Sequence, residues 1–248
     1  MSDLRSTEKR PVVAGRALMA GIFDVDGVLL ASPHERAWRE ALQGITAPDR
    51  FTTAMYQAHV AGKPRLSGAL AVLESLGVPE AEQLAAPYAE RKQRRLEELI
   101  HAGDFAAFPD ALRFVQAVRA LGCPMAVASS SHNANQMMQV IYLDSGQSLL
   151  EAFSANVCGR ELRQGKPNPE IFLLAAEELG VAPADCFVVE DAPAGIEAAR
   201  AGTMFALGIA RLGDADLLRA AGADLVVTSL DEIKVDELIG GRLCRPAT

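Results

Sequence analysis

The sequence lacks any long uninterrupted apolar stretch. Half of its 248 residues are hydrophobic, yet no run approaches the ~18 to 20 apolar residues that a membrane-spanning helix needs. The first residues carry mixed charges where a secretory signal would have an apolar core. We therefore expect a cytoplasmic protein that has no membrane partner.

Positive charge and cysteine are also scarce. The chain has 24 lysine and arginine residues against 32 aspartate and glutamate residues, a net charge of −8. Nucleic-acid binding favours a basic surface, so we expect no nucleic-acid partner. The cysteines are widely separated and show no C-x-x-C spacing, which favours buried reduced thiols over disulfides or a metal site. The four are Cys123, Cys158, Cys186 and Cys244.

Short apolar runs alternate with helical patterns through most of the chain. The runs predict strands at residues 18–23, 125–128, 153–158, 186–189, 204–209 and 225–228. Helices are predicted at residues 109–121, 168–179, a stretch ending at 199, 214–220 and 230–239. Such alternation is typical of an α/β fold with a doubly wound parallel sheet.

One segment departs from this alternation. Between residues 33 and 103 we find no convincing strand, and helices are predicted at residues 33–43, 49–61, 65–76 and 80–101. We predict a helical cap domain at 32–103, inserted between the first and second strands of a core formed by residues 18–31 and 104–248. Residues 1–17 are predicted to be a tail and lead-in, of which the first eleven are mobile.

Two carboxylates, Asp24 and Asp26, end the first predicted strand. On an extended backbone their side chains leave the same face, and Gly27 allows a sharp turn beyond them. Ligands of open α/β sheets bind outside the carboxyl ends of the strands. A divalent cation or a proton would relieve the repulsion between the carboxylates. The motif taken alone is equally compatible with a simple turn.

Three later stretches place polar residues at or near predicted strand ends. Ser129 closes the second strand, Lys166 lies in a Gly-Lys-Pro-Asn-Pro segment, and Glu190-Asp191 follows a buried strand. Separately, these residues could be a helix cap, an exposed loop lysine and an acidic helix start. Together with residues 23–28 they resemble, in the same order, the four motifs of the haloacid dehalogenase-like phosphotransferase superfamily.

The resemblance implies catalytic roles for four residues. Asp24 would be the nucleophile that forms an aspartyl phosphate, and Asp26 would be the general acid and base. Ser129 would donate its hydroxyl to a phosphoryl oxygen. Lys166 would neutralise the nucleophile and the phosphate as a point charge.

The resemblance also implies a Mg²⁺ cofactor. Asp24 and Asp191 would be direct ligands, and Asp26 would offer its backbone carbonyl. Glu190 would be a ligand, or it would contact a ligand without touching the metal. Hard oxygen ligands of this kind suit Mg²⁺.

Within the superfamily, the chain is most similar to β-phosphoglucomutase-type members with a helical cap. The similarity lies in His34-Glu-Arg-Ala-Trp38, in Arg65, in Arg91-Lys92 and in Ser131-His132-Asn133. It implies that the following residues contact substrate: His34, Trp38, Arg65, Lys92, Ser130, Ser131, His132 and Asn133. Trp38 could instead be a core residue, and Lys92 part of a charged helix face. Ala31, the Ser67-Gly68 pair and His132 depart from the family pattern, which leaves the substrate open.

We therefore expect a Mg²⁺-dependent phosphomutase that moves phosphate between positions of a hexose. A phosphatase of sugar or polyol phosphates is the alternative, and a non-catalytic binding module is a third possibility from a different class. A dehalogenase on the same fold would need neither Asp26 nor the acidic pair. The expected partner is a small phosphorylated metabolite, and the expected state is a monomer or weak homo-oligomer.

Overall fold

A six-stranded parallel sheet forms the centre of the molecule. The computed structural model describes residues 20–245. Its strands are β1 (Ala20–Phe23), β4 (Met125–Val127), β5 (Ala155–Asn156), β6 (Cys186–Glu190), β7 (Phe205–Ile209) and β8 (Leu225–Val227). They lie in the order β5-β4-β1-β6-β7-β8, and every neighbouring pair is parallel. The predicted doubly wound α/β fold is confirmed.

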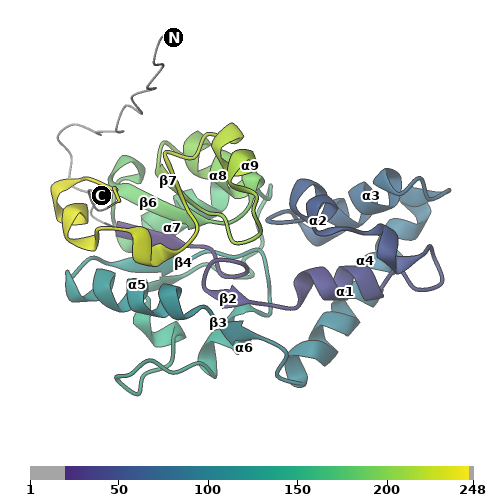
Figure 1. The fold of residues 1–248 in the computed structure, drawn as a ribbon, viewed down its shortest axis with the longest axis horizontal. Coiled ribbons are helices and arrows are strands. Elements are labelled where there is room, and N and C mark those ends of the chain that lie inside the picture. The colour runs from purple at the N-terminus through teal and green to yellow at the C-terminus, as the bar shows by residue number, and fades with distance from the viewer. Residues whose placement is uncertain (1–19, 246–248) are drawn as a thin grey trace, which may run out of the picture.

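Helices cover both faces of this sheet (Figure 1). On one face lie α5 (Pro109–Ala120) and α6 (Ala134–Gln139), with which Phe23 of β1 packs. On the other lie α7 (Glu170–Leu179), α8 (Pro193–Ala201) and α9 (Ala215–Ala220), with which Ile22 packs. Successive strand residues point to opposite faces, so a strand buried on both faces is apolar throughout.

The remaining helices form a separate layer beside the sheet (Figure 1). They are α1 (His34–Glu40), α2 (Thr53–His59), α3 (Arg65–Ser75) and α4 (Ala81–His101). Their apolar faces bury a cluster of their own, in which the Trp38 and Tyr88 rings meet edge to face at 5.2 Å. The Tyr88 hydroxyl donates to the Trp38 carbonyl at 2.8 Å, which satisfies its buried polar end. The exact division at residues 32 and 103 stays a prediction.

A two-stranded antiparallel ribbon connects these helices to the sheet. It pairs β2 (Leu30–Ala31) with β3 (Ala106–Ala107), so the chain leaves and returns side by side. Two-residue strands carry no periodicity, and the sequence did not predict them. The ribbon begins four residues after Asp26.

Some predicted elements differ from the structure. The predicted helix at 49–61 is wrong as one element: a 3-10 turn (Pro48–Arg50) precedes α2, which starts where the Thr52 hydroxyl accepts the Met55 N–H at 3.2 Å. The predicted helix at 230–239 is two 3-10 segments, Leu230–Glu232 and Val235–Gly240. Further 3-10 turns are Leu150–Ala152 and Pro183–Asp185.

Other predictions concern cysteines, the tail and the membrane. None of the four cysteines is in a disulfide; Cys158 and Cys186 are buried, and Cys123 and Cys244 are half-buried. The predicted tail and lead-in, residues 1–17, lie outside the described residues. Within residues 20–245, no helix has the length and apolar character needed to cross a membrane.

Candidate active site

The predicted catalytic residues meet where β1, β4 and β6 end. Asp24 directly follows β1, and its N–H donates to the Val189 carbonyl of β6 at 3.0 Å. On the other side of β1, the Ala128 N–H donates to the Phe23 carbonyl at 2.8 Å, which places Ser129 beside the same strand end. The parallel register therefore brings together residues that are far apart in the sequence.

Lys166 is buried between two carboxylates. Its Nζ atom lies 2.6 Å from Asp24 Oδ1 and also contacts the Glu190 carboxylate. Burial alone would lower the pKa of Lys166, but the charges of Asp24 and Glu190 hold it above its usual value. Burial raises the pKa of Glu190 to about 7, although Lys166 opposes the rise. The ammonium thus supplies a fixed positive charge beside Asp24.

Asp24, Glu190 and Asp191 form an acidic cluster. One carboxylate oxygen from each lies within 4.8 Å of the others. Burial raises the pKa of Asp24 and that of Asp191, and the neighbouring carboxylates raise that of Asp191 further. A cation at this point would relieve the cost of holding several carboxylates in a buried site. The donor set therefore fits a hard divalent cation such as Mg²⁺.

Glycine at position 27 is required for this packing. Its φ is +85°, and a Cβ atom there would lie 2.0 Å from Asp191 Oδ2. A side chain at this position would therefore displace a residue of the acidic cluster. The turn after Asp26 and the loop after β6 touch each other directly.

Asp26 lies at the centre of a second set of contacts. The Ser129 hydroxyl donates to Asp26 Oδ2 at 3.3 Å, and His34 Nε2 lies 3.5 Å from Asp26 Oδ1. Burial raises the pKa of Asp26, although the Ser32 hydroxyl and the Lys92 charge oppose the rise. A raised pKa favours the protonated carboxyl, which can act as an acid.

His34 links Asp26 to the helical layer. Its Nδ1 atom lies 3.1 Å from Lys92 Nζ on α4, and its Nε2 atom lies 3.5 Å from the Ser131 hydroxyl. Burial and the Lys92 charge lower the pKa of His34 well below its usual value, so the imidazole is neutral. Burial also lowers the pKa of Lys92 to about 7, with Asp26 opposing and Arg65 adding to the effect.

These residues surround one cavity of 270 Å³ between the sheet and the helices. Of the residues that the sequence singled out, thirteen line it: Asp24, Asp26, His34, Trp38, Arg65, Lys92, Ser129, Ser130, Ser131, His132, Asn133, Lys166 and Asp191. Glu190 does not line it; its side chain is fully buried behind Lys166. Trp38 packs in the helical core and also borders the cavity, and its contact with substrate stays a prediction.

The cavity has further polar lining residues that the sequence analysis did not select. Tyr56, Lys63 and Arg160 belong to no recognisable motif, and only the folded chain brings them to the site. Burial and the nearby carboxylates, Asp191 first among them, raise the pKa of Tyr56 well above its usual value. Of these three residues, only Lys63 has a signal in the sequence, because it lies in the segment Gly62-Lys63-Pro64-Arg65 beside Arg65.

The helical layer contacts the core at the edge of the cavity, beside Gly62, Pro64 and Gly165. A Cβ atom on Gly165 would lie 2.2 Å from the Pro64 ring, and one on Gly62 would lie 3.3 Å from the Ala192 side chain. The segment from Gly62 to Pro64 therefore packs over the loops that carry Lys166 and Asp191. This contact partly encloses the site.

A parallel sheet with a buried lysine and an acidic cluster at its carboxyl edge matches a known class of enzymes. The family model for haloacid dehalogenase-like hydrolases matches residues 19–203, more than half of the chain. The chain belongs to this family, and it is an enzyme.

Among individual proteins, the chain is similar to named sugar-phosphate enzymes of this family. A β-phosphoglucomutase from Mycobacterium bovis is 35% identical over 86% of this chain and 90% of its own length. A phosphorylated carbohydrates phosphatase from Thermotoga maritima is 31% identical over 84% of this chain and 93% of its own. The crystal structure of an archaeal β-phosphoglucomutase from Pyrococcus sp. is 34% identical, with a TM-score of 0.71 over 90% of this chain and 99% of that one.

Proposed function

We propose that this chain is a Mg²⁺-dependent phosphomutase of the β-phosphoglucomutase type, acting on a small phosphorylated sugar. The observation that carries the proposal is the composition of the single cavity described above. It joins a complete phosphoryl-transfer set around Asp24 to cationic and hydroxyl side chains contributed by the helical layer. The relatives named β-phosphoglucomutase support the same assignment.

The first half-reaction transfers the phosphoryl group to the enzyme. A carboxylate oxygen of Asp24 attacks phosphorus, and the bond between phosphorus and the sugar oxygen breaks. The protonated Asp26 gives its proton to the departing oxygen, as its raised pKa allows. Lys166 and the Ser129 hydroxyl stabilise the negative charge on the phosphoryl oxygens.

The second half-reaction regenerates the enzyme. Asp26, now ionised, accepts the proton of another sugar hydroxyl, whose oxygen attacks phosphorus. The bond between phosphorus and Asp24 breaks, which returns the carboxylate. If water replaces the sugar hydroxyl, the same residues give a phosphatase, so the acceptor alone separates the two activities.

Mg²⁺ would be held by the Asp24 and Asp191 carboxylates and by the Asp26 carbonyl. Glu190 would be a further ligand or would hold the neighbouring residues in place without contacting the metal. When bound, it neutralises charge on the transferring phosphoryl group. Glu190 fits the supporting role, because it bonds to Lys166 and accepts the backbone N–H groups of Asp191 at 3.0 Å and Ala192 at 3.1 Å.

A mutase must also hold the phosphate that is not reacting. Arg65 is suited to this role: it is exposed, it borders the cavity, and within residues 20–245 its side chain has no ion-pair partner. Ser130, Ser131, His132 and Asn133 line the opposite wall, and Lys92 lies nearby. An intermediate bisphosphate could turn around between these groups while the helical layer excludes water.

Phosphorus NMR tests the proposal directly. The wild-type protein is supplied with Mg²⁺, β-glucose 1-phosphate and a trace of glucose 1,6-bisphosphate. We expect conversion to glucose 6-phosphate, which proves a sugar acceptor. Accumulation of inorganic phosphate without the 6-phosphate would instead establish a phosphatase. No Mg²⁺-dependent turnover on a broad panel of phosphate esters would refute both and leave a binding module.

A further inference from the structure

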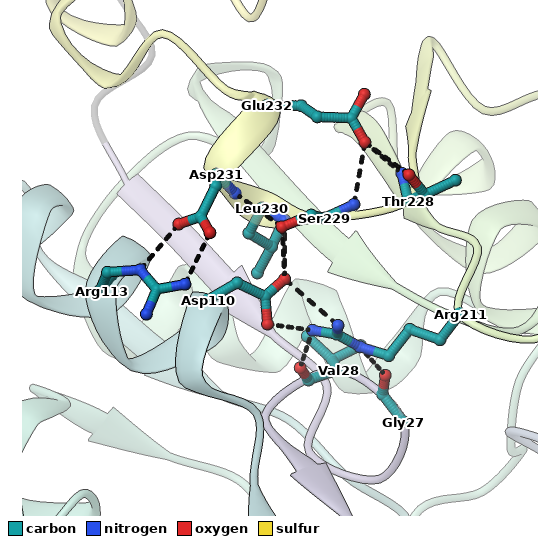
Figure 2. A network of polar contacts seen from close by, with 10 residues as sticks. All are labelled: Gly27, Val28, Asp110, Arg113, Arg211, Thr228, Ser229, Leu230, Asp231 and Glu232. Carbon is teal, nitrogen blue, oxygen red and sulfur yellow. Dashed lines mark hydrogen bonds and ion pairs between the residues drawn. The ribbon is translucent and has the colours of Figure 1, made fainter.

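Arg211 binds the backbone immediately beyond the catalytic Asp24–Asp26 segment. It lies two residues after β7, and its side chain is only 13% exposed. Its Nε atom donates to the Gly27 carbonyl at 3.0 Å, and its Nη2 atom donates to the Val28 carbonyl at 3.1 Å (Figure 2). Across residues 20–245, no other donor is found for either carbonyl.

The guanidinium is itself fixed on its other edge. Its Nη1 and Nη2 atoms donate to the two Asp110 oxygens at 3.2 and 3.1 Å, and its Cζ atom lies 3.7 Å from the centre of the Phe108 ring. Asp110 in turn accepts the Leu230 N–H at 2.8 Å and the Ser229 hydroxyl at 3.2 Å (Figure 2). A planar fork with this many fixed partners has little freedom to move.

The turn held by Arg211 directly follows Asp26. The Gly27 N–H donates to the Leu30 carbonyl at 2.8 Å, and the Leu30 N–H donates to the Val25 carbonyl at 2.9 Å, so Asp26 sits inside a closed loop. Among residues 20–245, no backbone N–H donates to the carbonyls of Gly27 and Val28 in that loop. The guanidinium supplies the donors that complete it.

The same residue also contacts the start of the returning chain. The Phe108 N–H donates to the Leu29 carbonyl at 3.0 Å, and Phe108 directly follows β3. Arg211 therefore contacts the core ends of both connections to the helical layer.

We propose that Arg211, held by Asp110, is a positioning residue that keeps the Asp26 carboxyl aimed at the leaving-group oxygen. The inference rests on the proposed function, because it takes Asp26 as the general acid. A misplacement of about 1 Å can cost on the order of 100-fold in rate. The loss should fall on substrates that need the proton of Asp26.

The test uses a series of substituted phenyl phosphates with Mg²⁺, in which only the pKa of the leaving phenol changes. In Arg211→Lys, one ammonium cannot replace the fork that reaches two carbonyls and a carboxylate. We expect kcat/KM to fall about 10- to 100-fold for unsubstituted phenyl phosphate and less than about threefold for the most activated ester. The dependence of rate on leaving-group pKa should therefore become steeper.

Arg113→Ala is the matched control. Arg113 forms a two-point ion pair with Asp231 at 2.9 and 2.6 Å on the same side of the core, but it does not touch the turn (Figure 2). It should leave the slope unchanged. Asp110→Asn, which keeps the side-chain shape, should steepen the slope as Arg211→Lys does, and it carries the test if the lysine variant does not fold.

Asp26→Asn separates this inference from the proposed function. If Asp26→Asn steepens the slope and neither Arg211→Lys nor Asp110→Asn does, Arg211 does not position the acid. An equal loss on all esters in the Arg211 and Asp110 variants would likewise overturn the inference, because it indicates a purely structural role. If Asp26→Asn itself leaves the slope unchanged, Asp26 is not the general acid and the proposed mechanism fails first.

Discussion

Replacing Lys92 by methionine should make the folded protein more stable while impairing its reaction with substrate. Lys92 is 3% exposed, and its ammonium is held between the His34 ring nitrogen at 3.1 Å and the Trp38 ring at 5.1 Å. These contacts do not compensate for lost hydration, since its pKa falls from 10.5 to about 7. Methionine has a similar length and no charge to bury.

The size of the effect follows from proton linkage. Between pH 7 and pH 10.5, Lys92 binds a proton in the unfolded chain and not in the folded one, so its unfavourable contribution to stability shrinks as pH rises in that window. The buried charge costs up to about 5 kcal/mol at pH 6 and about 2 kcal/mol at pH 9. The variant lacks this titration, and its advantage should shrink by about 3 kcal/mol between the two values.

Urea unfolding followed by circular dichroism measures the free energy of unfolding of Lys92→Met and of the wild type at pH 6 and pH 9. The difference between the two proteins at each pH gives the gain and its change with pH. Lys63→Met is the matched control, because the Lys63 ammonium borders the same cavity but is only partly buried and donates to the Ala58 carbonyl at 3.0 Å. It should give no gain in stability at pH 6, because a partly exposed ammonium keeps much of its hydration. A Lys92→Met protein that is no more stable than wild type at pH 6, or equally stabilised at both pH values, would refute the reasoning.

Three further outcomes follow from the site and its surroundings. Asp24→Asn should abolish turnover with the fold intact, and fluoroberyllate with Mg²⁺ should raise the melting temperature of the wild type only; residual activity near wild type would remove Asp24 from its role. Arg65→Ala should reduce conversion of β-glucose 1-phosphate about 10- to 100-fold more than hydrolysis of 4-nitrophenyl phosphate, which has no second phosphate to hold. Equal losses on both substrates would show that Arg65 does not hold the non-reacting phosphate. Burial tends to raise the pKa of Asp110, but the Leu230 N–H and Arg211 hold it below 3.8, so its contribution to stability is complete above that pH and is lost as pH falls through the folded value. The stability difference between wild type and Asp110→Asn should therefore narrow in acid-unfolding curves below about pH 4, whereas a constant difference would show that the carboxylate charge does not matter.

The sequence predicted the α/β core because its signals there are local and repeated. Each buried strand is a short apolar run, and the polar residues that follow β1, β4 and β6 mark the edge where a site belongs. Asp24, Ser129 and Asp191 each follow a predicted strand, and a parallel sheet places the residues after its strands at one edge. Lys166 needed the resemblance, because it lies on a loop.

Sequence reasoning failed where structure depends on contacts between distant segments. The ribbon of β2 and β3 exists through pairing across more than seventy residues, and neither strand has a pattern of its own. Tyr56 of α2 and Arg160 of the loop after β5 are far apart in the sequence, and they meet at the cavity only in the folded chain. Arg211 resembles any arginine after a strand until its two carbonyl partners are seen. Glu190 was recognised, but its burial behind Lys166 was not.

The position of β1 at the middle of the sheet has a consequence for synthesis of the chain. β1 emerges first from the ribosome, but its partners in the sheet are β4 and β6, about one hundred and more than one hundred and sixty residues later. Helices α1 to α4, which lie between them in sequence, bury their own apolar cluster with short-range contacts and can form earlier. Asp24 therefore has no partner strand beside it until β4 has been made, and Lys166, Glu190 and Asp191 follow later still. The nascent chain cannot assemble this cluster before about three quarters of its 248 residues are synthesised.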